Sequence, residues 1–97
     1  MWILRSSEAD GALTFRLTSG AAKTFGRAPR ADFIVDAALV SRLHCRIVGG
    51  DHDIDVEDLS STNGIFINDE RVDKGRLRSG DRLRIGRVEL SVERTDA

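Results

Sequence analysis

The sequence is poor in the residues that cross-link or stiffen small proteins. Its 97 residues include one cysteine, one proline and no tyrosine. Cys45 alone cannot form a disulfide within the chain, so we expect a fold that rests on one hydrophobic core, in a reducing compartment. No apolar run is long enough to span a bilayer, and the run at residues 1–4 is too short for the core of a signal peptide. We therefore expect a cytoplasmic protein with no membrane partner.

The sequence also lacks an excess of either charge. It has 15 Lys and Arg against 16 Asp and Glu, for a formal net charge of -1. A protein whose main task is to coat nucleic acid needs a long-range positive field, which this balance does not supply. With 40% hydrophobic and 32% charged residues, the composition is that of a folded globular chain. We expect a single domain over residues 1–97, as a monomer or weak oligomer.

What the sequence does contain is a series of short β-rich runs separated by Gly, Asp, Asn and Ser. No ten-residue stretch keeps the apolar spacing of a core helix. Apolar and polar residues alternate most clearly at 83–85 and 88–93, which is typical of half-buried strands. The predicted strands are Trp2–Arg5, Leu13–Thr18, Lys23–Gly26, Phe33–Val35, His44–Val48, Ile54–Glu57, Ile65–Ile67, Arg82–Ile85 and Glu89–Glu93. The prediction is an all-β fold of two packed antiparallel sheets.

Four short segments in the predicted loops and strand ends have functional chemistry: Gly26-Arg27, Ser41-Arg42-Leu43-His44, Ser61-Thr62-Asn63-Gly64 and Asn68. Each also has a plain structural explanation. The arginine of the first segment is then simply solvated, and the histidine of the second is hydrogen-bonded at the start of a strand. The Asn-Gly pair predicts a type I′ turn that joins a strand at 56–59 to one at 65–67.

Taken together, the segments indicate an anion site, because loops gather at the ends of a sandwich. Arginines, hydroxyls and an amide that meet there suit a dianionic phosphate better than a single carboxylate, since Arg binds phosphate oxygens in pairs. The side chains concerned are those of Arg27, Ser41, Arg42, Thr62 and Asn63. Alternatively, the side chain of Asn63 binds the backbone of a bound peptide.

The order of these segments resembles the forkhead-associated (FHA) domain pattern: Gly-Arg, Ser-Arg-x-His, Ser-Thr-Asn-Gly and an Asn four residues on. Asp58-Leu59, Gly80-Asp81 and Ile85-Gly86 fit the same pattern, and the resemblance runs from Trp2 to Glu93. It implies a sandwich of about eleven strands that binds phosphothreonine in a partner protein, downstream of a Ser/Thr kinase. It implies no catalysis and no cofactor.

The resemblance also implies a role for each site residue. Phosphate contacts fall to Arg27, Ser41 and Thr62, with Arg42 nearby, while Asn63 bonds the peptide main chain. The framework that fixes loop shape consists of Gly26, His44, Gly64 and Asn68, with His44 tethering the loops from beneath. The family prefers phosphothreonine over phosphoserine through a contact to the γ-methyl group. Arg42 adds charge, which favours acidic peptides.

Three other types of site agree less well with the sequence. A hydrolase trio of Ser41, His44 and Asp58 lacks the Gly-x-Ser-x-Gly element that positions such a nucleophile. A metal site is disfavoured because His44 and Cys45 are adjacent in a strand and point to opposite faces, and His52 has no paired ligand.

A nucleic-acid surface would use the basic segment 74–78 with Arg82, Arg84 and Arg87, yet aromatic residues for base stacking make up only 5% of the chain. A solvated strand face explains these arginines equally well. A phosphate-independent interaction module on the same fold is the remaining alternative. It is disfavoured because the phosphate-binding residues of the family pattern are all present.

Overall fold

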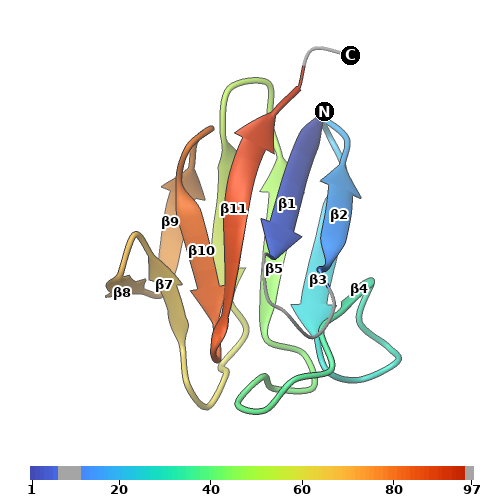
Figure 1. The fold of residues 1–97 in the computed structure, drawn as a ribbon, viewed down its shortest axis with the longest axis vertical. Coiled ribbons are helices and arrows are strands. Elements are labelled where there is room, and N and C mark those ends of the chain that lie inside the picture. The colour runs from blue at the N-terminus through green and yellow to red at the C-terminus, as the bar shows by residue number, and fades with distance from the viewer. Residues whose placement is uncertain (7–11, 96–97) are drawn as a thin grey trace.

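A computed structural model describes residues 1–6 and 12–95 of the chain as two packed β-sheets (Figure 1). The described residues contain eleven strands and no helix, so the predicted all-β sandwich of about eleven strands is confirmed. The strands are β1 (Trp2–Ser6), β2 (Thr14–Leu17), β3 (Ala22–Gly26), β4 (Phe33–Ile34), β5 (Cys45–Gly49), β6 (Ile54–Asp58), β7 (Ile65–Ile67), β8 (Glu70–Val72), β9 (Lys74–Leu77), β10 (Arg82–Ile85) and β11 (Val88–Arg94). With no helix in these ranges, none is present there that could cross a membrane.

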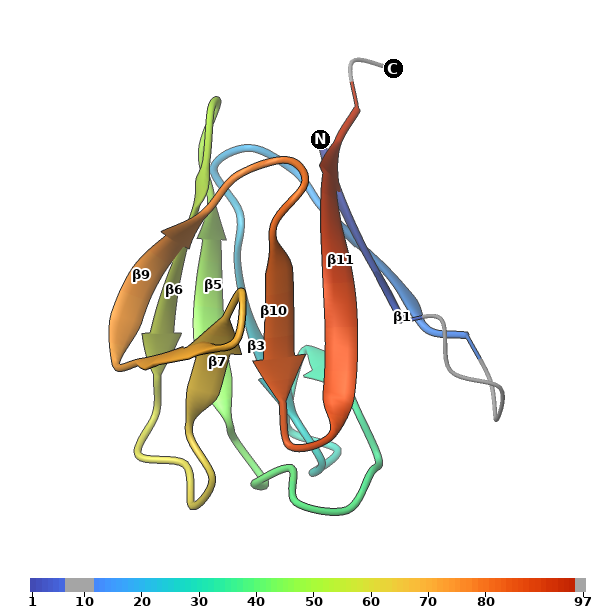
Figure 2. The same ribbon diagram turned by 60° about the vertical axis from the view of Figure 1, so that its left-hand side comes forward.

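Sheet A has the strand order β2-β1-β11-β10-β7-β8, and sheet B has the order β4-β3-β5-β6-β9. Figure 2, turned from the first view, shows the two layers facing each other. Alternate residues of each strand point between the layers, as in β11, where the side chains of residues 88, 90 and 92 are buried and those of 89, 91 and 93 are exposed. The burial of these apolar residues is the main stabilising term of the fold.

The core is continuous across both sheets. Its buried members include Trp2, Leu4, Leu17, Phe25, Ile47, Ile54, Ile65, Leu77, Leu83, Ile85 and Leu90. At one end of the core, three phenylalanine rings, those of residues 15, 25 and 33, pack with centroids 5.0–5.3 Å apart. The indole N–H of Trp2 donates a 2.8 Å hydrogen bond to the carbonyl oxygen of Gly50, so this buried aromatic keeps no unpaired polar atom.

Strands β8 and β9 were not predicted from the sequence, because neither carries an alternating apolar pattern. Each is the edge strand of its sheet, where charged side chains are common since they discourage pairing with other chains. In β9, Lys74 and Arg76 form ion pairs with Glu57 and Asp55 of the neighbouring strand. The residue between them, Gly75, packs against the side chain of Ile67.

Two connections differ from the sequence-based expectation. β4 pairs with β3 in parallel, while the other strand pairs are antiparallel. The predicted hairpin at Thr62-Asn63-Gly64 is wrong, since β6 belongs to sheet B and β7 to sheet A. A type I′ turn needs positive φ at both central residues, and only Gly64 of this Asn-Gly pair has it. The segment 59–64 therefore crosses between the sheets.

Several connections between strands gather at one end of the sandwich. Met1 and the end of β11 lie at the other end, joined by a 2.8 Å hydrogen bond from the backbone N–H of Thr95 to the carbonyl of Met1. Figure 1 shows the connections β3–β4, β4–β5 and β6–β7 together below the strands, with the tight β10–β11 turn beside them. This end contains most of the residues that the sequence singled out.

Candidate functional site: the loop rim

We call the loop rim the three connections at residues 27–32, 35–44 and 59–64. They come from distant parts of the chain, and their shape is set by hydrogen bonds between them. Connections between strands of sheet B and the crossover from sheet B to sheet A lie together at this end.

Ser41 joins the first and third segments of the loop rim. Its carbonyl accepts the backbone N–H of Arg27 at 3.0 Å, and its hydroxyl oxygen accepts the backbone N–H of Thr62 at 3.1 Å. The Nε–H of Arg27 donates to the carbonyl of Val40 at 3.1 Å, which holds the base of the guanidinium beside Ser41. The structure thus brings together Arg27, Ser41 and Thr62.

His44 lies under the loop rim and is fully buried. Its Nδ1 accepts the backbone N–H of Ser41 at 3.0 Å, and its Nε2 lies 2.8 Å from the carbonyl oxygen of Gly64. A carbonyl can only accept, so the ring is the neutral tautomer with its proton on Nε2. Both ring nitrogens are thereby bonded to backbone atoms of two different loops. The ring does not bond the Ser41 hydroxyl, which the hydrolase alternative would require.

Asn63 ties the β6–β7 connection to the β4–β5 connection. Its side-chain N–H donates to the carbonyl of Leu39 at 2.9 Å. Leu39 has φ of 69°, an uncommon conformation for a branched residue, and its side chain is 48% exposed. Gly86, in the β10–β11 turn, lies so close that an added Cβ would be 3.0 Å from the Leu39 carbonyl carbon. The side-chain oxygen of Asn63 accepts no hydrogen bond from the described residues.

Two glycines permit the close approach of these loops. A Cβ on Gly26 would lie 2.0 Å from the carbonyl oxygen of Arg42, so a larger residue there would push the loop away. Gly64 has φ of 78°, which glycine adopts without strain. Arg42 thus contributes its backbone to the site, and its exposed side chain makes no hydrogen bond or ion pair within the described residues.

The loop rim also contains a hydrogen-bonded residue, Ser61, that was not among the predicted site residues. The hydroxyl of Ser61 donates to the carboxylate of Asp58 and accepts the backbone N–H of Gly64 at 2.9 Å. An Asp followed three residues later by Ser is a sequence signal for such a local turn.

Asn68 lies away from the loop rim, at the other end of β7. Its side-chain oxygen accepts the backbone N–H of Arg82 at 3.0 Å, and its side-chain N–H donates to Asp81 at 3.0 Å. With φ of 49°, it shapes the turn after β7 and anchors the start of β10. Of the predicted framework residues, Gly26, His44 and Gly64 adjoin the loop rim and Asn68 does not.

The loop rim contains arginines that form no ion pair within the described residues. The ion pairs of the described residues are Arg5–Glu93, Lys74–Glu57, Arg76–Asp55 and Arg82–Asp69, and none includes Arg27 or Arg42. The hydroxyl protons of Ser41 and Thr62 also remain available, because neither hydroxyl donates a hydrogen bond within the described residues. These donors favour an anionic ligand.

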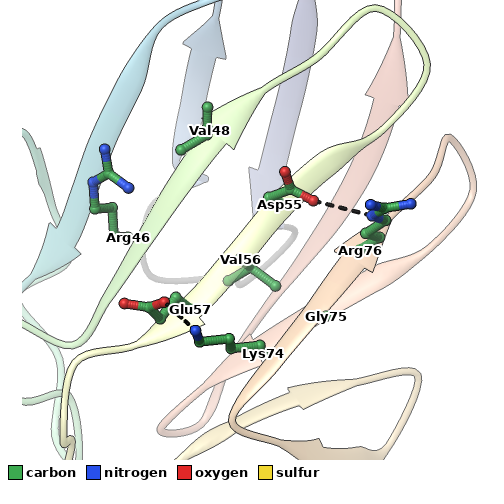
Figure 3. Close-up of a pocket in the computed structure, with 8 residues that line it drawn as sticks. All are labelled: Arg46, Val48, Asp55, Val56, Glu57, Lys74, Gly75 and Arg76. Atoms are coloured by element: carbon green, nitrogen blue, oxygen red, sulfur yellow. Dashed lines mark hydrogen bonds and ion pairs between the residues drawn. The ribbon is translucent and has the colours of Figure 1, made fainter.

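A shallow pocket of about 410 Å³ lies elsewhere, on the outer face of sheet B (Figure 3). Its basic side chains Lys74 and Arg76 each contact a carboxylate at 3.2 Å, that of Glu57 and that of Asp55. Figure 3 shows both pairs as cross-strand contacts between β6 and β9. Two of the three cations that line the pocket are therefore already paired with carboxylates, and the third, Arg46, forms no ion pair within the described residues.

Cys45 follows His44 into the core. Burial raises the pKa of its thiol from 9.0 to about 12, and the negative charge of Asp58 adds to the shift. A thiol with this pKa is not nucleophilic at neutral pH. No three His, Cys, Asp or Glu side chains of residues 1–6 and 12–95 gather closely enough to hold a metal ion.

Comparison with known proteins then decides the family. The family model of the FHA domain matches residues 23–86, from β3 through the loop rim to the turn after β10. This chain belongs to the FHA domain family. The resemblance seen in the sequence motifs is confirmed.

Solved FHA domains share its fold closely. The FHA domain of CT664 from Chlamydia trachomatis has a TM-score of 0.90 at 23% identity, and the match covers 97% of each chain. The FhaA FHA domain, solved in complex with the intracellular domain of Rv3910, has a TM-score of 0.85 at 31% identity and covers 96% of this chain and all of that one. FHA domains are phosphothreonine-dependent interaction modules, and a structure from a study of such interactions matches at 30% identity with a TM-score of 0.87.

Among curated relatives, two mycobacterial proteins differ greatly in length from this chain. The ABC transporter ATP-binding/permease protein Rv1747 of Mycobacterium tuberculosis is 38% identical over 80 residues, which are 82% of this chain and 9% of that protein. The glycogen accumulation regulator GarA of the same organism is 37% identical over 65 residues, which are 67% of this chain and 40% of GarA. The FHA domain is therefore a part of each of these longer proteins.

Proposed function

We propose that the loop rim of this FHA domain binds a short, extended segment of a partner protein through a phosphothreonine. The observation that carries the proposal is that hydrogen bonds bring Arg27, Ser41 and Thr62 together, and that neither Arg27 nor Arg42 forms an ion pair within the described residues. A dianionic phosphate is the ligand whose charge and number of acceptor oxygens match these donors.

In this proposal Arg27 supplies the guanidinium, and the hydroxyls of Ser41 and Thr62 donate shorter-range bonds to the phosphate oxygens. The free side-chain oxygen of Asn63 accepts a main-chain N–H of the peptide beside the phosphothreonine. Gly26, His44 and Gly64 keep the loops in place without touching the ligand. Arg42 lies close enough in sequence to Ser41 to add positive charge, which favours acidic residues in the peptide.

The expected affinity is micromolar. Each charge-assisted hydrogen bond contributes about 1.5–3 kcal/mol, but ordering a flexible peptide cancels much of the sum. The net binding free energy should be about −8 kcal/mol, which corresponds to a Kd near ~1 µM.

Binding should weaken as the pH falls through about 6, because the second ionisation of the phosphate lies there and the ligand loses one negative charge below it. Titration calorimetry with one phosphothreonine peptide between pH 5 and 7.5 measures this dependence. An affinity that stays flat over that range would show that the dianion is not the recognised species.

The wider role we propose is that of a non-catalytic adaptor in phosphorylation-dependent signalling. Its partner is a cytoplasmic protein phosphorylated by a Ser/Thr kinase, and the module needs no cofactor and no contact with membrane or nucleic acid. We further propose that residues 1–97 fold as a single domain, monomeric or weakly associated. The complex of the FhaA FHA domain with the intracellular domain of Rv3910 supports a protein partner inside the cell.

The alternative is a module on the same fold that binds its partner without phosphate. A peptide library with a fixed central phosphothreonine, together with the same peptides carrying threonine or phosphoserine, separates the two. We expect tight binding only with phosphothreonine, and weaker binding with phosphoserine. Equal binding of the unphosphorylated library would establish the alternative.

A further inference from the structure

Next to the loop rim, the outer face of sheet A has an arginine-rich surface that the motif analysis did not identify. It spans β8, β7 and β10, where Arg71 pairs in register with Phe66, and Phe66 pairs with Arg84. The three side chains therefore lie side by side on one face. We call them the arginine strip.

The first arginine of the strip reaches the loop rim directly. A Cβ on Gly64 would lie 2.6 Å from Nε and 2.9 Å from Cζ of Arg71, so the guanidinium packs against the Cα of this glycine. Gly64 follows Asn63, the residue proposed to bond the peptide main chain. The absence of a side chain at residue 64 is what allows the guanidinium to lie beside the proposed peptide path.

The second arginine is held by an aromatic ring. The Cζ atom of Arg84 lies 4.0 Å from the centroid of the Phe66 ring, a cation–π arrangement that fixes the guanidinium without neutralising its charge. Glu89 is opposite Arg84 in the strand register, yet the two do not form an ion pair. Neither arginine of the strip hydrogen-bonds or pairs with a carboxylate within the described residues.

We propose that the arginine strip binds a carboxylate of an Asp or Glu that flanks the phosphothreonine in the partner segment. The proposal rests on the proposed function of the loop rim and adds a second contact to it. Charge complementarity favours the carboxylate, and the planar guanidinium of Arg71 suits its two oxygens. The strip differs from Arg42, which lies in the β4–β5 connection.

The distance along the chain indicates where the acidic residue lies. Gly64 is two residues from Thr62, so their Cα atoms are at most about 7 Å apart. An extended peptide advances about 3.3 Å per residue, so an acidic side chain roughly two to four residues from the phosphothreonine meets the strip.

The test uses one phosphothreonine peptide series in which a single Asp is moved through the four positions on each side of the phosphothreonine, with Asn as the neutral match. We expect one position, two to four residues away, to bind the wild-type protein about three- to tenfold more tightly with Asp, with the gain shrinking at high salt. Arg71→Gln should abolish this gain while keeping the preference for phosphothreonine over threonine.

Arg16→Gln is the matched control, because Arg16 is exposed on β2, the opposite edge of sheet A, and pairs with no carboxylate within the described residues. It should keep the Asp gain in full. Arg84→Gln should reduce the gain, and melting curves report whether each variant is folded.

The proposal is overturned if no position gains from Asp, or if Arg71→Gln weakens Asp and Asn peptides equally. Loss of all phosphothreonine dependence in the wild-type protein is a different result, which would overturn the proposed function of the loop rim together with this contact.

Discussion

Basic side chains occupy two contrasting environments in this FHA domain. On the outer face of sheet B, Lys74 and Arg76 each contact a carboxylate at 3.2 Å. At the loop rim, the Arg27 side chain bonds only the carbonyl of Val40 within the described residues, and Arg42 has no ion pair there. Lys74 and Arg76 are therefore locally neutralised, whereas Arg27 and Arg42 of the loop rim form no ion pair within the described residues.

The contrast shows that counting basic residues along the sequence is a poor guide to anion binding. The segment 74–78 is the more basic stretch, yet it includes β9, whose Lys74 and Arg76 lie in register with Glu57 and Asp55 of β6. Exposed pairs of this kind contribute only about 0–1 kcal/mol to stability, but they remove the local positive field. Arg27 is the better candidate for a phosphate ligand because it forms no ion pair within the described residues.

Replacing one arginine in each environment gives the largest expected difference. Arg27→Ala should lower phosphothreonine-peptide affinity at least about a hundredfold, because it removes the main charge-assisted contact. Arg76→Ala, an exposed arginine of the same sheet, should leave affinity unchanged and cost less than about 1 kcal/mol of stability. Calorimetry on both variants checks this, and equal losses of affinity would contradict the distinction between the two environments.

His44→Ala should destabilise the protein by about 2–3 kcal/mol, since it removes a buried ring and leaves the Ser41 N–H and the Gly64 carbonyl without their bonds. Because both bonds support the loop rim, peptide affinity should fall as well.

Cys45→Ala is the control, since Cys45 is the next buried residue and forms none of these loop contacts. It should lower the melting temperature without lowering the affinity of the folded protein. An unchanged melting temperature in His44→Ala would argue against the tethering role.

Replacing the two asparagines of the motif pattern compares a residue of the loop rim with one at the other end of β7. Asn63→Ala should weaken peptide binding about fivefold, because it removes the proposed main-chain contact and the bond to Leu39. Asn68→Ala should instead lower stability by about 1 kcal/mol with little effect on binding, since its bonds hold the start of β10. Parallel denaturation and binding measurements distinguish these outcomes, and a binding loss confined to Asn68→Ala would reverse the assignment.

The smallest expected effect concerns alkaline stability. The pKa of Cys45 is raised from 9.0 to about 12, so between these values the unfolded chain loses the thiol proton while the folded chain keeps it. This contribution to stability is fully present below pH 9 and decreases as the pH rises towards 12, by about 1 kcal/mol at pH 10. Urea unfolding of the wild-type protein and Cys45→Ala at pH 8 and 10 measures it. Identical losses in both proteins would show that the thiol is not responsible.

The sequence predicted the strands with strong alternation, such as β10 and β11, because one face of each packs in the core. It did not predict β8 and β9, whose exposed edges place charges and a glycine where the pattern analysis requires apolar residues. The Asn-Gly pair was misread as a hairpin because local turn preference does not reveal that its flanking strands belong to different sheets.

The convergence of three candidate site residues was predictable from ordered motifs, since Arg27, Ser41 and Thr62 lie together at one end of the sandwich. The contribution of Leu39 was not predictable, because its role depends on a positive φ and a backbone carbonyl and not on its side chain. Arg71 was missed for a related reason: it lies in an unpredicted strand and reaches the loop rim only through packing on Gly64.

The most direct test of the loop rim as the ligand site is an NMR titration of the folded protein with a phosphothreonine peptide. We expect the largest amide shifts at residues 27, 41, 62 and 63, with little change at residues 46, 55, 57, 74 and 76 of the sheet B face. Shifts centred on the sheet B face, with the loop rim unchanged, would contradict the account.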